Sequence, residues 1–145
     1  MKLKSFDHMN CSLAQTLSVV GERWSLLIIR DASFGVSRFD DFQKSLGVAR
    51  NMLSTRLKQL TEAGILVRTP DEQGRFEYRL TEKGWDLMPV LLAMTHWGDR
   101  HMPPEQGERV TFVDKSKGRP IAPMAIRDAD GKVLKYNEIR PRSGR

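Results

Sequence analysis

The chain has 145 residues, of which 39% are hydrophobic and 29% are charged, a composition typical of one globular domain with short additions. No apolar run approaches the roughly 20 residues that cross a bilayer, and residues 1–11 lack the apolar core of a signal peptide, so we expect a cytoplasmic protein without a membrane partner. A single cysteine cannot form an intramolecular disulfide. Because the three histidines are scattered along the sequence, we expect neither a metal site nor a cofactor.

The net charge of +6 and the sequence pI near 9.8 favour an anionic partner. Residues 107–145 hold ten Lys and Arg against five Asp and Glu, which gives this segment a charge of +5. Residues 1–106 therefore carry only +1. Any nucleic-acid affinity of the main domain must come from the placement of its basic residues rather than from their excess.

The first predicted helix runs from residue 11 to residue 20. Leu13, Leu17 and Val20 recur at spacings of four and three, which is one face of a helix. Asn10 is expected to be its N-cap and Gly21 its end.

The second predicted element lies between Trp24 and the turn signal Phe34-Gly35. Its residues 26–29 are apolar on every side, so their periodicity fits a buried helix and a buried strand equally. Helical patterns flank this run, and the turn closes it at a typical helix length, which favours a buried central helix.

A helix, a turn and a longer helix are predicted between residues 37 and 63. Phe39, Phe42 and Leu46 form an apolar stripe at helical spacing, and Gly47 ends it. Ser37 followed by an acid three residues later resembles a capping box. The next stripe consists of Leu53, Leu57 and Leu60, with Gly64 as the left-handed residue after the helix.

A hairpin is predicted next. Residues 65–68 and 76–80 are strand-like, and residues 70–74 contain the Pro, Asp and Gly that favour turns. Helix, turn, helix and hairpin in this order predict a winged helix-turn-helix, mainly α with a small β-hairpin.

The remainder of the chain is predicted to be one long helix and a small appendage. Thr81 caps the helix, which extends toward His101 with a kink at Pro89. After Pro103-Pro104, short β-like runs alternate with Lys-Gly and Asp-Gly turns. We therefore expect an N-terminal arm (1–9), a DNA-binding and dimerisation domain (10–102) and a basic, β-rich C-terminal extension (103–145).

The helix at residues 49–63 has the residues that a recognition helix needs. With its three leucines turned inward, the helical repeat places polar residues outward: Arg50, Asn51, Ser54, Thr55 and Lys58. Arginine bonds guanine and asparagine bonds adenine bidentately, and the others suit bases or phosphates. Any amphipathic surface helix also has a polar face, so the order of the elements is what favours DNA recognition.

Two further arginines are candidate DNA contacts. Arg75 lies beside the glycine of the predicted wing and could reach a minor groove or a phosphate, although Asp71 and Glu72 count against a strongly attracting tip. Arg38, near a helix start, is a candidate phosphate contact, and a simple surface role is an equal alternative.

Several motifs in order resemble the HxlR-type family of bacterial winged-helix regulators, which are relatives of the MarR group. The resemblance covers about residues 8–101 and rests on these segments: CSLAQTLSVVGERWSLLIIRD, RFDDF, NMLSTRLKQLTEAGIL, YRLTEKG and PVLLAMTHWG. It implies a homodimer, formed by the N-terminal segment and the long helix after the wing, on a pseudo-palindromic operator. It also implies a repressor or an activator.

The chain departs from the family pattern in two places. Ala49-Arg50 stands where the family commonly has Ser-Pro or Ser-Thr, which removes an N-cap and adds an arginine at the groove-facing end, so we expect a different operator. Longer members often carry cysteine pairs in their C-terminal extension, whereas residues 110–145 contain none.

Cys11 aligns with a cysteine that is a redox or electrophile sensor in some family members. A helix N-terminus stabilises a thiolate, which supports reactivity. The alternative is a small hydrophobic residue packed against a partner subunit. A lone cysteine would have to sense through an intersubunit disulfide or an adduct.

The leading hypothesis is a dimeric, sequence-specific transcriptional regulator, and the alternative is a protein-interaction module on a winged-helix scaffold. An enzyme is not expected, because no catalytic arrangement of Ser, Cys, His or carboxylates has a recognisable spacing. Six bulky side chains could line an effector pocket, although such residues usually belong to the core: Trp24, Phe34, Trp85, Met88, Met94 and Trp97.

Overall fold

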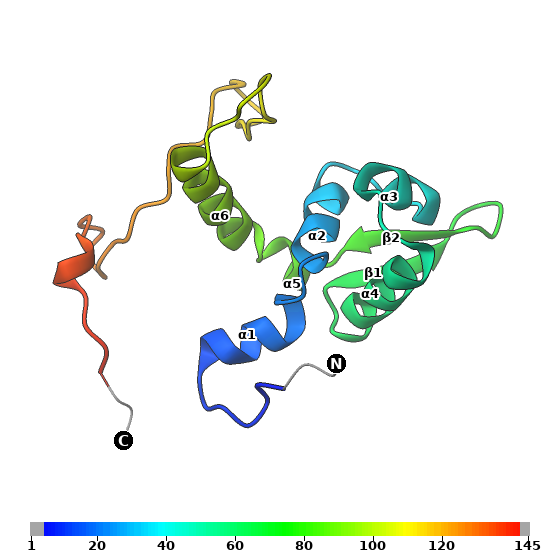
Figure 1. The fold of residues 1–145 in the computed structure, drawn as a ribbon, viewed down its shortest axis with the longest axis horizontal. Helices are drawn as coiled ribbons and strands as arrows, with labels where there is room; N and C mark the ends of the chain where they lie inside the picture. Colours follow the sequence, from blue (N-terminus) through cyan, green and yellow to red (C-terminus); the bar gives the residue numbers. More distant parts are fainter. Residues whose placement is uncertain (1–4, 143–145) are drawn as a thin grey trace. The chain divides into compact units, whose positions relative to one another are not determined.

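The computed structural model describes residues 5–142, so residues 1–4 of the expected N-terminal arm and residues 143–145 of the extension lie outside the described part. The chain forms two compact units, one ending at Leu91 and the other beginning at Leu92. The first unit contains α1 (Ser12–Val20), α2 (Ser25–Ser33), α3 (Phe39–Leu46), α4 (Arg50–Glu62), β1 (Leu66–Pro70), β2 (Phe76–Leu80) and α5 (Glu82–Trp85) (Figure 1). The division falls inside α6 (Met88–His101).

Helix α2 is the centre of the first unit, as the sequence predicts. Ile28 and Ile29 are fully buried, and α2 contacts α3, α4 and β2. Phe42 of α3, the three leucines of α4 and Leu66 of β1 complete the core, each at most 2% exposed. Burial of large aliphatic and aromatic side chains of this kind is the main stabilising contribution to the fold.

A tight turn joins α3 to α4. Gly47 ends α3 in the left-handed region, with φ of 63°, where a residue without a Cβ is favoured. Val48 follows and is 5% exposed, which anchors the turn in the core. Helix α4 then runs from Arg50 to Glu62, so the predicted helix-turn-helix is present and its second helix lies within one residue of the predicted range 49–63.

The two strands form the antiparallel hairpin that the sequence predicts, with Leu66 opposite Leu80 and Pro70 opposite Phe76. Ser37 joins this hairpin instead of capping α3, because its carbonyl accepts a 2.8 Å hydrogen bond from the Tyr78 N–H. The prediction of a Ser37 capping box is therefore wrong. The N-cap position of α3 belongs to Arg38, whose side chain makes no capping bond.

Two other expectations about helix ends are incorrect. Cys11, not Asn10, occupies the N-cap position of α1, and no side chain caps that end. Thr81 does cap a helix, because its hydroxyl accepts from the Gly84 N–H, but that helix is the short α5. The predicted kink is a full break, since Pro89 in the first turn of α6 has no N–H and its ring excludes a helical carbonyl four residues earlier.

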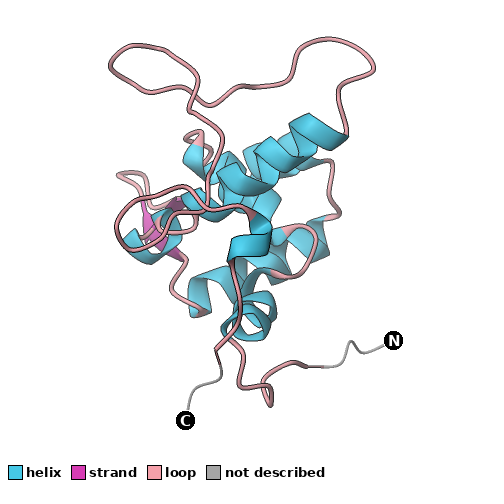
Figure 2. Ribbon diagram, turned by 90° about the vertical axis from the view of Figure 1, so that its left-hand side faces the viewer, coloured by secondary structure: helices cyan, strands magenta, loops and turns pink. Residues whose placement is uncertain are grey.

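The C-terminal extension contains turns rather than the expected β structure. Its described part has two single-residue antiparallel bridges, Val113 with Pro120 and Arg127 with Val133, and one short 3-10 helix, η1 (Tyr136–Glu138). Figure 2 shows long loops in pink and strands in magenta only at the hairpin. The β-like runs are exposed except for Phe112 and Leu134, which are half-buried. Because these bridged segments bury no apolar face against another element, they do not extend into strands.

Candidate nucleic-acid interface

Helix α4 has a buried face and an exposed face. Its leucines at positions 53, 57 and 60 are at most 1% exposed. The opposite side is exposed and carries all five residues predicted to meet DNA: Arg50, Asn51, Ser54, Thr55 and Lys58. The structure thus brings these donors together on one side of one helix.

The first turn of α4 combines a positive side chain with backbone donors. Ala49 offers no side-chain acceptor at the N-cap, so the N–H groups of this turn are left for solvent or a ligand. The Arg50 guanidinium carbon lies 4.6 Å from the Phe39 ring centroid, and its Nη1 lies 3.6 Å from Asp40 Oδ1. The Arg50 side chain is nevertheless 70% exposed, so this turn presents a site suited to an anion.

The hydroxyl of Thr55 is already partly engaged. It donates to the Asn51 carbonyl at 2.9 Å, so its remaining capacity is to accept a hydrogen bond, for example from a base amino group. Lys58 is exposed in the following turn and has no such restriction on its ammonium group.

Arg38 holds the hairpin in place. Its Nη2 forms ion pairs with Asp71 and, at 3.0 Å, with Glu77 Oε1, and its Nη1 donates to the Phe76 carbonyl at 3.3 Å. The Arg38 side chain is 27% exposed. The residue predicted to contact phosphate thus has its guanidinium directed at acidic groups of its own chain.

Asp71 organises the turn at the tip of the hairpin. Its Oδ1 accepts hydrogen bonds from the N–H groups of Gln73 and Arg75, both at 2.8 Å. Partial burial opposes ionisation, but the bond from Arg38 and these backbone bonds outweigh it and lower the pKa of Asp71 to about 2. Of the two acids that counted against DNA binding, Asp71 is therefore directed inward, whereas Glu72 is exposed.

Three arginines point outward from the hairpin, together with Glu72, which is exposed at its tip. Arg75 is 68% exposed, with its Nε 3.3 Å from Asp71 Oδ2. Arg68 places its guanidinium 3.5 Å from the Phe76 ring centroid. Arg79 is 61% exposed and pairs with Glu77 at 2.8 Å. The hairpin thus presents three basic groups on ordered side chains.

Two interactions that the sequence analysis missed help to hold α4 in place. In the middle of the helix, Arg56 Nε pairs with Glu22 Oε2 at 3.0 Å, and both side chains are 21% exposed. At the C-terminal end, Lys83 Nζ donates to the Ala63 carbonyl at 2.7 Å. In the sequence, Arg56 lies between the inward leucines and the outward polar residues of α4. This border position is the only sequence signal for its ion pair with Glu22.

Cys11, the predicted redox residue, is exposed at the start of α1. Its side chain makes no capping hydrogen bond. An exposed sulfur is sterically available to an oxidant or to a second thiol.

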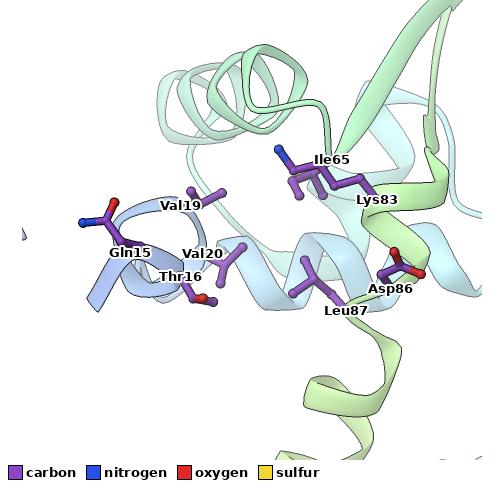
Figure 3. Close-up of a pocket in the computed structure, with 8 residues that line it drawn as sticks. All are labelled: Gln15, Thr16, Val19, Val20, Ile65, Lys83, Asp86 and Leu87. Atoms are coloured by element: carbon purple, nitrogen blue, oxygen red, sulfur yellow. The ribbon is translucent and has the colours of Figure 1, made fainter. Parts of the chain in front are cut away.

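A cavity of about 290 Å³ lies between α1 and α5 in the first unit (Figure 3). Its lining residues are Gln15, Thr16, Val19, Val20, Ile65, Lys83, Asp86 and Leu87. None of the six predicted pocket residues is among them. Four of those six are instead 47–57% exposed on outward helix faces or turns: Phe34, Trp85, Met94 and Trp97. A small-molecule effector stays a prediction.

Residues 5–142 contain no group of three or more His, Cys, Asp and Glu side chains that could hold a metal ion. In the same part of the chain, no helix has the length and apolar character needed to span a membrane.

Residues 19–106 match the family model described as HxlR-like helix-turn-helix. This chain belongs to the HxlR family. Over 135 residues the HxlR-type chain is 37% identical to the uncharacterized HTH-type transcriptional regulator Rv3095 of Mycobacterium tuberculosis, a match that covers 92% of this chain and 85% of the relative.

Solved structures have the same fold. PA1607, a proposed transcription factor, has a TM-score of 0.90 at 39% identity, covering 97% of this chain and all of the other. The redox regulator HypR in its reduced form has a TM-score of 0.57 at 30% identity, covering 63% of this chain and 95% of the other. The HxlR-type chain is a winged helix-turn-helix transcriptional regulator and not an enzyme.

Proposed function

We propose that this HxlR-type regulator binds double-stranded DNA as a homodimer on a pseudo-palindromic operator, with one α4 in each of two major grooves roughly 34 Å apart. The observation that carries the proposal is the exposed polar face of α4 opposite its buried leucines. Arg50 and Asn51, in the half of the helix that enters a groove first, are assigned to base edges. Ser54, Thr55 and Lys58 serve bases or phosphates.

The hairpin is the wing of this interface. Arg75, exposed at the tip, contacts a phosphate or a minor groove. Arg38 acts through the wing rather than on DNA, since its guanidinium lies against Asp71 and Glu77.

The homodimer is proposed from apolar surface on two helices. Leu13 and Leu17 on α1 are 68% and 43% exposed, and Met94 and Trp97 on α6 are each 57% exposed. Large apolar side chains repeated along a helix in this way are typical of a protein interface.

The first prediction separates base recognition from phosphate contact. Arg50→Ala should reduce the preference for the operator over an unrelated duplex by about 1–3 kcal/mol, because one bidentate base contact is lost. Lys58→Ala, the matched control on the same helix face, should weaken binding to both duplexes alike and lower the salt slope by about 1. Gel shifts over a salt series, with DNA upstream of the protein's own gene, measure both effects.

If Arg50→Ala prefers the operator over an unrelated duplex as strongly as the parent protein does, α4 does not read bases through Arg50. A parent protein that prefers no segment of its upstream DNA would instead favour the protein-interaction module.

We further propose that Cys11 makes DNA binding responsive to oxidation, a role favoured by its exposure and by the similarity to a protein named as a redox regulator. Diamide takes two electrons and two protons from two thiols, leaving one disulfide between subunits. We expect a covalent dimer on a non-reducing gel and altered operator affinity, with neither change in Cys11→Ser. Operator affinity that is unchanged when Cys11 is fully oxidised would refute sensing.

A further inference from the structure

The wing tip has a specific hydrogen-bonding pattern over residues 71–75. The Asp71 N–H donates to the Arg75 carbonyl at 2.6 Å, and the Gly74 N–H donates to the Asp71 carbonyl at 3.0 Å. The Asp71 carboxylate accepts from the N–H groups of Gln73 and Arg75. Gly74 has φ of 78°, and the basic residue follows it.

The same pattern recurs in the C-terminal extension over residues 128–132. The Asp128 N–H donates to the Lys132 carbonyl at 2.9 Å, and the Gly131 N–H donates to the Asp128 carbonyl at 3.0 Å. The Asp128 carboxylate accepts from the N–H groups of Asp130 and Lys132 at 3.0 and 2.8 Å. Gly131 has φ of 86°. Sequence DADGK is thus folded as DEQGR is in the wing.

A third turn, over residues 114–119, is one residue longer and otherwise alike. The Asp114 N–H donates to the Arg119 carbonyl and the Gly118 N–H to the Asp114 carbonyl, both at 2.9 Å. The Asp114 carboxylate accepts from the N–H groups of Lys117 and Arg119 at 2.5 and 3.2 Å. Hydrogen bonds led by that from Lys117 hold the pKa of Asp114 below its usual value, although partial burial opposes them.

In all three turns the acid is half-buried and the basic residue after glycine is exposed. Asp71, Asp114 and Asp128 direct their carboxylates onto the backbone of their own turns. The exposed residues are Arg75, Arg119 and Lys132. Asp114 and Asp128 therefore shape their turns, and each turn presents an exposed basic side chain after its glycine, although Asp130 is also exposed in the turn at residues 128–132.

We propose that the turns at residues 114–119 and 128–132 contact the sugar–phosphate backbone of DNA through Arg119 and Lys132. This inference rests on the proposed function, because the DNA is the duplex that α4 engages. A guanidinium and an ammonium recognise phosphate oxygens by charge and hydrogen bonding, without reading sequence. The extension therefore adds affinity and not specificity.

Duplex DNA is the partner that these observations favour over an acidic protein or RNA. The two turns reproduce the wing tip of the same chain, whose partner is DNA under the proposed function, and 107–145 carries a charge of +5. Each phosphate contact neutralised by a basic side chain releases counterions, which makes the affinity depend on salt.

The first test compares two double substitutions that remove the same charge. Arg119→Gln with Lys132→Gln should weaken binding to operator and unrelated duplexes by the same factor and reduce the salt slope by about 1.8 per protomer. The control, Lys135→Gln with Arg140→Gln, removes two exposed charges of the extension outside the turns and should have the smaller effect. Equal losses in both pairs, or no loss in the first pair, would overturn the assignment.

The second test changes turn geometry at constant charge. Asp128→Asn keeps an acceptor for the backbone N–H groups, whereas Asp128→Ala removes it, and both raise the net charge by one. We expect Asp128→Ala to bind DNA more weakly than Asp128→Asn. Equal affinities would show that the turn does not position Lys132 for DNA.

The two proposals fail in distinguishable ways. If the parent prefers its operator and the Arg119 and Lys132 substitutions change nothing, the inference about the extension is refuted and α4 remains the DNA-binding element. If the parent binds every duplex equally and those substitutions weaken it, specific reading is refuted and the extension contact stands. If the substitutions weaken binding to single-stranded RNA but not to duplex DNA, the partner class is wrong.

Discussion

Asp71 lies at the tip of a hairpin that we propose to contact DNA, where an acid is unexpected. Its carboxylate is surrounded by donors, namely the Arg38 guanidinium and the N–H groups of Gln73 and Arg75. Removing Asp71 would raise the formal charge of the tip, but Arg75 would lose its ion pair and Arg38 would keep only Glu77 and the Phe76 carbonyl as partners. For the wing, the order that Asp71 imposes on the neighbouring arginines therefore matters more for the proposed DNA contact than the negative charge that it adds.

The titration of Asp71 can be measured directly. The pKa of Asp71 is lowered from 3.8 to about 2, so the ionised carboxylate stabilises the wing fully above pH 3.8, and this contribution is lost as the pH falls toward 2. We expect the Arg75 backbone amide to titrate in ¹H–¹⁵N spectra with a midpoint near 2. In Arg38→Gln the midpoint should rise toward 3.8, and an unchanged midpoint would contradict the role of Arg38.

Among the elements, those with apolar stripes were predictable. The leucine stripe of α4 and the glycines that end α3 and α4 predicted the helix-turn-helix and the five exposed residues of the candidate interface. The role of Arg38 was not predictable, because its partner Asp71 is 33 residues away and is reached only when the hairpin folds back. Local propensity likewise did not show that the β-like runs of the extension would form only single-residue bridges and no strands.

Helix α5 depends on a close backbone contact that the sequence pattern does not reveal. Gly84 is buried, and a Cβ on it would lie 2.3 Å from the Ile65 carbonyl oxygen and 2.9 Å from Leu80 Cδ2. Only glycine allows α5 to lie directly on the residue that enters β1.

Gly84→Ala should therefore destabilise the protein by about 1–3 kcal/mol, because backbone has to move to admit a methyl group. A urea unfolding curve measures this change. Gly98→Ala is the control, since its Cβ would meet no atom within 4 Å in the helical α6, and it should be neutral or mildly stabilising. Similar midpoints for the two variants would show that the contact at Gly84 is not tight.

At the scale of the whole molecule, the exposed apolar residues along α1 and α6 are the observation that supports the proposed homodimer. Leu13 is 68% exposed and Trp97 is 57% exposed, so most of each side chain lies in water in the described chain. A second copy would cover them and set the separation of the two α4 helices.

Leu13→Asp should convert the homodimer to a monomer, because a carboxylate would have to be desolvated in the interface. Val110→Asp is the matched control, since both parent side chains are 68% exposed. Light scattering after size exclusion measures the mass, and a gel shift should show that the monomer loses operator affinity. A dimeric Leu13→Asp protein would exclude α1 from the interface.

The hydrogen bond from Tyr78 to Ser37 and the ion pairs of Arg38 tie the wing to the segment that precedes α3. Under the proposed function, the wing and α4 would therefore meet DNA already ordered with respect to each other. Binding would then cost little conformational entropy, in contrast to basic arms that fold on the duplex. We expect the heat-capacity change of DNA binding to be that of the surface buried in the interface, without a contribution from folding.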